Sequence, residues 1–225
     1  MNNINNLYET MKLNWDDITI ADLVKIREIG TLQLATEDEK NLRVAAIVND
    51  IPYEQLIQVP LSQIRTYMDA TEFLLTEPKA KKVKNHYTIN GRKYKLLKNE
   101  MDLLTAQYID FQSVQQDGFD KRPAELLSVM MVPEGHNYND GYDKDQVIED
   151  MYDMSVTEAL GIVDFFTRRF RRSIAWAKTL CKVKMRLARL TARKENREMY
   201  KALELQMNLI LDEAISVYGS LVWKR

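Results

Sequence analysis

Few side chains in this sequence are of the kinds that carry out covalent or acid–base chemistry. The chain of 225 residues has two histidines, His86 and His136, and a single cysteine, Cys181. This set excludes most pairings of a nucleophile with a base, and it supplies too few ligands for a zinc site. The sequence also has no glycine-rich phosphate loop, nucleophile elbow or paired CxxC motif. We therefore expect a protein that is not an enzyme and that uses no metal or cofactor.

Two acidic patterns imitate a chemical site. Adjacent carboxylates occur at Asp16 with Asp17 and at Glu149 with Asp150. Neighbouring residues on a helix face different ways, so we predict that these carboxylates are solvated surface charges. The segment 137–141 resembles a calcium-binding loop, but with Gly141 at the sixth position the twelfth is Val147 instead of Glu. We predict a turn there.

Segregated charge is the most informative property of the sequence. The net charge is −1, yet residues 165–194 carry eleven Arg or Lys and no acid, and residues 78–99 carry eight and no acid. Residues 134–158 carry eight acids against the single Lys144. Densely packed cations repel one another, so an anionic partner is expected beside them. The residues that we expect to contact this partner are Arg168, Arg169, Arg171, Arg172, Lys178, Lys182, Lys184, Arg186, Lys93 and Lys95.

Three anionic surfaces are candidates for that partner. The acids of 134–158 would neutralise the basic helix within the same subunit or in a neighbouring one. The backbone of a nucleic acid would be bound without sequence preference and with steep salt dependence. A membrane surface is disfavoured, because apart from Trp176 the basic stripe lacks an opposite face rich in Trp and Leu.

Helical spacing and capping residues position these charges. Thr19 with Asp22 opens an apolar helical pattern, a second helix is predicted over 39–48, and Pro52 and Pro60 precede helices over 53–58 and 61–75. Further helices are predicted over 105–114 and 123–131, and Ser155 with Glu158 forms a capping-box pattern before the basic helix.

One segment follows a strand pattern instead. Asn90-Gly91 is a strong hairpin signal within 86–97, and a two-residue turn pairs Ile89 with Arg92 and Tyr87 with Tyr94. Alternation along the two strands places an apolar set on one face and a cationic set on the other. The apolar set is Tyr87, Ile89, Tyr94 and Leu96, and the cationic set is Lys84, His86, Lys93 and Lys95.

The sequence thus predicts a mainly α protein, a helical bundle with one small β-hairpin and a long carboxy-terminal helical arm. We divide it into a globular region at 1–132, an acidic loop with a short helix at 133–154, and a basic arm at 155–225. The polar stretch 191–198 leaves two forms of the arm open, a helical hairpin and one long helix. An apolar stripe on the arm predicts an oligomer interface at Leu203, Met207, Ile210, Ala214, Val217 and Leu221.

No export or membrane segment is expected. The polar amino terminus lacks the basic start and apolar block of a signal peptide, and no apolar run approaches 18 residues. We therefore expect no export and no membrane partner. The single cysteine, Cys181, cannot form an internal disulfide, which favours a reducing compartment.

The segment 103–172 resembles uncharacterised virion and tail-assembly proteins of crAss-like and other Bacteroidales bacteriophages. The resemblance rests on LTAQYIDF at 104–111, ELLSV at 125–129, VPEG at 132–135 and DGYD at 140–143, followed by Phe165-Phe166 in a basic helix. It covers roughly residues 15–175, and its motifs are structural and not catalytic.

This resemblance implies a setting. The chain would be a helical virion protein, made in the cytoplasm of the bacterial host, packed in the capsid or tail lumen and delivered with the genome as cargo. Its partners would be other virion proteins, including copies of itself, with non-specific contact to DNA. The alternatives are a tail assembly chaperone that leaves before maturation and an accessory protein that binds DNA inside the cell.

Overall fold

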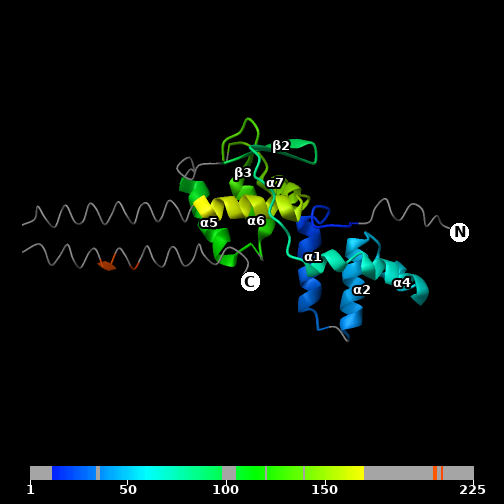
Figure 1. Cartoon of the computed structure of the whole chain (residues 1–225). Helices are drawn as coiled ribbons and strands as arrows, with labels where there is room; N and C mark the ends of the chain where they lie inside the picture. The colour runs from blue at the N-terminus through cyan, green and yellow to red at the C-terminus, as the bar shows by residue number, and fades with distance from the viewer. Residues whose placement is uncertain are drawn as a thin grey trace, which may run out of the picture.

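The structure is a computed structural model that describes residues 12–33, 36–97, 105–119, 121–138 and 140–169, together with 205, 206 and 209. Within these residues the chain is mainly helical and contains one small three-stranded antiparallel sheet, which confirms the predicted fold class (Figure 1). The predicted hairpin or long helix of the arm lies outside the described residues.

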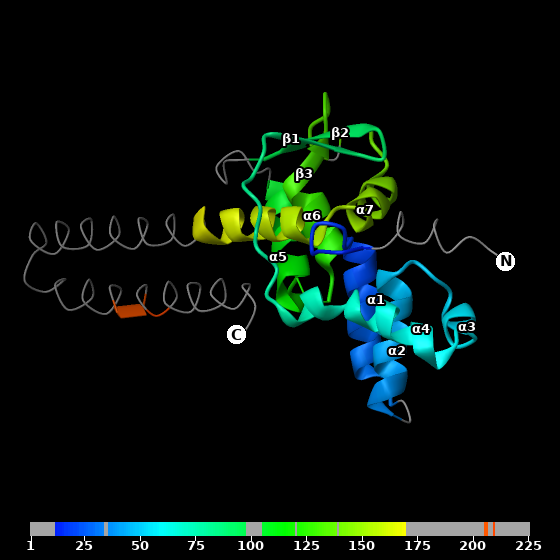
Figure 2. The same cartoon turned by 45° about the vertical axis from the view of Figure 1, so that its right-hand side comes forward.

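Helices α1 (Ile20–Thr31) and α2 (Glu37–Val48) pack beside each other (Figure 2). The predicted start of α1 is confirmed, because Thr19 and Asp22 cap each other's backbone amides reciprocally. Helix α2 begins two residues before the prediction, since the Thr36 side chain accepts a hydrogen bond from the amide of Glu39 and caps the helix there.

Two short helices follow the prolines as predicted. Helix α3 spans Tyr53–Leu56 and α4 spans Leu61–Asp69, and together with α2 they enclose a small separate core around Leu56. The predicted helix over 61–75 ends early and resumes as a 3-10 turn at Glu72–Leu75. It is interrupted because both the amide and the hydroxyl of Thr71 donate to the Met68 carbonyl, at 2.9 and 2.7 Å.

The hairpin is present in the predicted register. Strand β1 (His86–Ile89) pairs with β2 (Arg92–Leu96), and Asn90 and Gly91 adopt φ values of 50° and 74°, as a type I′ turn requires. Tyr87, Ile89, Tyr94 and Leu96 are buried, which confirms the apolar face.

A third strand, β3 (Met131–Pro133), was not predicted from the sequence. It pairs with the free edge of β2, giving the order β1-β2-β3. The amide of Leu97 donates to the carbonyl of Met130 at 3.1 Å, and that of Glu134 donates to the carbonyl of Lys93 at 2.8 Å. These bonds place Met131 in a strand and not in the helix predicted over 123–131, and the strand extends to Pro133, the first residue of the predicted loop.

Four further helices complete the fold, namely α5 (Thr105–Asp117), α6 (Pro123–Met130), α7 (Lys144–Tyr152) and a helix at 156–169, yellow in Figure 2. The main core extends from Ile18 to Phe166 and includes the inner face of the sheet. It therefore contains residues on both sides of positions 132 and 155, where the sequence suggested divisions.

An extended strap at 77–84 crosses the helix at 156–169. The amide of Lys81 donates to the carbonyl of Thr157 at 2.9 Å, and a Cβ built on Gly161 would lie 2.2 Å from the Lys81 carbonyl oxygen. Glycine at position 161 therefore lets the strap backbone lie directly on the helix. Asp16 and Glu158 hold the strap through Lys81 at 3.0 Å and Lys84 at 2.6 Å.

Candidate functional site

The two predicted anion-binding residues of the hairpin lie on the open face of the sheet. Lys93 and Lys95 are exposed on β2, opposite the exposed Thr88 and His86 of β1. Within the described part of the chain, neither lysine forms an ion pair. These two side chains are therefore available to a partner.

Arg168 and Arg169 stand at the end of the helix at 156–169. Arg168 donates from Nε to Asp164 Oδ1 at 2.8 Å and from Nη2 to Oδ2, and this hydrogen bonding raises the pKa of the guanidinium. The guanidinium of Arg169 lies over the Phe165 ring, 5.7 Å from its centroid. Outside the described residues lie Arg171, Arg172, Lys178, Lys182, Lys184 and Arg186, and the predicted interface residues Leu203, Met207, Ile210, Ala214, Val217 and Leu221.

The acids of 134–158 contact the first basic segment, 78–99. Two ion pairs join the two segments, from Asp150 to Arg92 at 2.9 Å and from Glu158 to Lys84 at 2.6 Å, and Glu134 Oε1 lies 3.4 Å from His86 Nδ1. Hydrogen bonding and the charge of Glu158 raise the pKa of Lys84. Two acids of this segment, Asp150 and Glu158, thus neutralise one cation each in the strap and hairpin.

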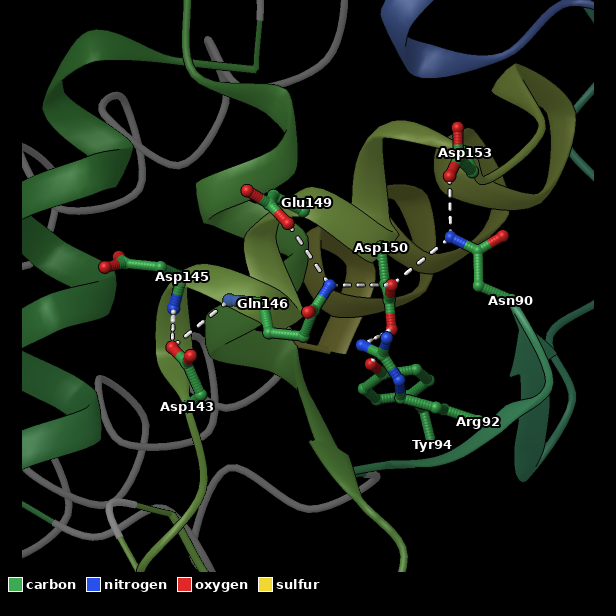
Figure 3. A network of polar contacts seen from close by, with 9 residues as sticks. All are labelled: Asn90, Arg92, Tyr94, Asp143, Asp145, Gln146, Glu149, Asp150 and Asp153. Carbon is green, nitrogen blue, oxygen red and sulfur yellow. Dashed lines mark hydrogen bonds and ion pairs between the residues drawn. The ribbon is translucent and has the colours of Figure 1, made fainter.

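Asp150 is the centre of this contact (Figure 3). Its side chain is 1% exposed, and its Oδ2 accepts hydrogen bonds from Arg92 Nη1 at 2.9 Å and from the Tyr94 hydroxyl. Its Oδ1 accepts from Asn90 Nδ2 at 3.2 Å and from Gln146 Nε2 at 3.5 Å. Asn90 also donates to Asp153 at 2.6 Å, so α7 is tied to both the turn and the second strand of the hairpin.

Tyr94 keeps its proton in this network. Burial raises the pKa of its phenol far above the usual value, and the hydrogen bond and negative charge of Asp150 raise it further. The phenol is thus a permanent donor, and each oxygen of Asp150 already accepts two hydrogen bonds. This arrangement suits a structural carboxylate and leaves it no lone pair aimed at a substrate.

For Asp150 the prediction of solvated surface charge is wrong, whereas Glu149 is exposed as predicted. Asp150 and Met151 follow Val147 by three and four residues, so all three lie on the buried face of α7. That spacing could have revealed its burial, because a carboxylate on an apolar helix face must find donors.

A pocket of about 220 Å³ lies where α5, α6 and α7 meet. In its wall Asp110 Oδ2 accepts from the Tyr138 hydroxyl at 2.5 Å and from Lys144 Nζ at 3.2 Å. The hydrogen bond from Tyr138 lowers the pKa of Asp110, and Lys144 lowers it further. Asp110 and Glu125 face Arg122 and Lys144 in the lining, so the wall combines two anions with two cations.

The remaining polar candidates are structural. The amide of Asp140 donates to the carbonyl of Asn137 at 3.0 Å, as in the turn predicted there, and His136 Nδ1 lies 2.9 Å from the Asp140 carbonyl oxygen. In the described part of the chain, no group of three His, Cys, Asp or Glu could hold a metal ion. No helix there is both long enough and apolar enough to cross a bilayer.

Comparisons with protein-family models, with curated proteins and with solved structures found no match to this chain. The functional argument therefore rests on the site itself.

Proposed function

We propose that this chain is a non-enzymatic structural protein that packs beside an anionic partner through its basic arm helix. One observation carries the proposal, namely that the acids of 134–158 contact the strap and hairpin. Glu134, Asp150 and Glu158 have partners in 78–99. In the described part of the arm helix, Arg168 forms an ion pair with Asp164 of the same helix. These three acids therefore contact residues outside the arm, which supports a partner in another molecule for the cations of 165–194.

The setting we propose is a bacteriophage particle. A mainly helical body followed by a segment that is predicted to be a basic helix suits a protein packed in the capsid or tail lumen beside DNA, as the resemblance of 103–172 implies. Mass spectrometry of purified particles tests this setting, because a virion component remains with the particle whereas a tail assembly chaperone does not.

Duplex DNA is the probe for the anionic partner. Replacing Arg168, Arg169, Arg171 and Arg172 together by Gln should weaken binding at low salt and lower the salt slope by about 0.9 for each phosphate that is no longer neutralised. A control with the same change of charge elsewhere should bind as the parent does. Its four substitutions are Lys25→Gln, Lys40→Gln, Arg65→Gln and Lys121→Gln.

Fluorescence anisotropy at several salt concentrations measures both quantities, and thermal melting accompanies it. If the arginines serve internal charge balance, the fourfold variant melts earlier and binds DNA as the parent does. A parent protein that binds no DNA even at low salt would contradict the nucleic-acid form of the proposal.

A further inference from the structure

Two exposed surfaces of opposite charge lie on different elements of the body. We name the first the lysine face, made by Lys93 and Lys95 on the open side of β2. We name the second the acidic stripe, made by Asp145, Glu149 and Asp153 of α7 and its carboxy-terminal cap. Each surface gathers like charges at close spacing, so each is stabilised by a partner of the opposite sign.

Within the body the acidic stripe contacts neutral groups. Glu149 accepts from Gln146 Nε2 at 3.2 Å, and Asp153 accepts from Asn90 Nδ2 at 2.6 Å (Figure 3). Asp145 is exposed at the other end of the stripe. Among the described residues no cation pairs with the stripe, and these amide donors carry no charge to neutralise it.

The lysine face of the same molecule cannot supply the missing cations. Tyr94 lies between Lys93 and Lys95 along β2, and its hydroxyl donates to Asp150 on α7. Side chains alternate between the faces of a strand, so both lysines point away from α7. The two surfaces therefore face different directions and can meet only between molecules.

The spacing of the two surfaces matches. Lys93 and Lys95 are two residues apart on a strand, which is about 6.7 Å. Asp145 and Glu149 are four residues apart on a helix, which is about 6 Å along the axis. Two lysines of one molecule can thus meet two carboxylates of another at the same time.

We propose that the lysine face binds the acidic stripe of a second copy of this chain. The inference rests on the proposed function as a protein packed in many copies, and it names the contact between copies. A nucleic acid on the lysine face would leave the acidic stripe without a cationic partner. Contact between copies neutralises both surfaces at once, and because it joins two different patches it repeats from copy to copy.

Charge exchange tests the contact. One variant carries Lys93→Glu with Lys95→Glu, and the other carries Asp145→Lys with Glu149→Lys. In sedimentation velocity at low salt the parent should associate, and each variant alone should associate at least about tenfold more weakly, because like charges now meet. An equimolar mixture of the two variants should associate again, since each supplies the surface that the other needs.

A control variant, Lys79→Glu with Lys82→Glu, makes the same change of charge on the strap and should associate like the parent. Circular dichroism checks that every variant folds, and Gln replaces the reversed charge in any that does not. Variants that associate like the parent, or a mixture that stays dissociated, would overturn the inference. So would a lysine face that binds DNA but no second copy.

The DNA-binding assay separates this inference from the proposed function. If the charge-exchange variants do not behave as expected but the arm still binds DNA, only the contact between copies is contradicted. If the mixture of variants associates again but the parent protein binds no DNA, only the nucleic-acid partner is contradicted.

Discussion

Asp150 keeps a negative charge where water cannot reach it. Burying a carboxylate is unfavourable unless donors replace the lost solvent, and here a guanidinium, a phenol and two amides do so. Three of these donors come from the hairpin and one from α7 itself. The residue therefore fixes how the hairpin lies on α7.

Removing that charge should destabilise the fold. Asp150→Asn puts an amide nitrogen, which is a donor, among groups that are donors already. We expect the free energy of unfolding to fall by about 2–3 kcal/mol, as measured by urea denaturation. The exposed Asp145→Asn on the same helix is the matched control and should change it by less than about 0.5 kcal/mol. Equal effects of the two substitutions would contradict the role of Asp150.

The elements that could be predicted are those whose signals lie within a few residues. The Thr19 and Asp22 cap and the Asn90-Gly91 turn each specify their own conformation, and both were correctly predicted. Strand β3 depends on the edge of β2, some 35 residues earlier in the chain, so no local pattern reveals it. In the candidate site Lys93 and Lys95 were predicted on the exposed face, whereas the contact of 134–158 with the hairpin required the tertiary structure.

The strap and the helix at 156–169 lie in close contact at Gly161. Gly161→Ala would place a methyl group 2.2 Å from the backbone oxygen of Lys81, which cannot rotate away as a side chain would. We expect this substitution to lower the free energy of unfolding by about 1–3 kcal/mol in chemical denaturation. Gly30→Ala in α1, with nothing within 4 Å, should instead raise it by about 0.4–1 kcal/mol. Two changes of the same sign would argue against the contact.

At the scale of the whole molecule, two further aspartates, Asp16 and Asp110, also join segments that are distant in sequence. Asp16 accepts from Thr157 at 2.5 Å and pairs with Lys81, and Asp110 joins α5 to Tyr138 and Lys144. The hydrogen bond from Thr157 is the main reason that the pKa of Asp16 is lowered, as that from Tyr138 is for Asp110.

These lowered pKa values predict sensitivity to acid. The folded state holds both carboxylates ionised more strongly than the unfolded state does, so their stabilisation is present above the unfolded pKa of about 3.9. It is lost as the pH falls through the folded values. Urea denaturation over a range of roughly pH 6 to roughly pH 2 should show a decline in stability that is shallower in Asp16→Asn with Asp110→Asn. If the stability of that variant declines with falling pH as steeply as the stability of the parent does, other groups cause the decline.

The hydrogen bond between Thr157 and Asp16 spans 141 residues and closes the body of the protein. Beside it the amide of Val156 donates to the carbonyl of Ile18, and the amide of Ile20 to the carbonyl of Met154. A ribosome adds about 5–20 residues per second, so on the order of ten seconds pass between the synthesis of these two segments. Ile18 and Ile20 are fully buried in the folded protein, but during this interval the segment at 154–157 is not yet available to pack against them. The nascent chain must therefore keep α1 from aggregating until the helix at 156–169 has been made.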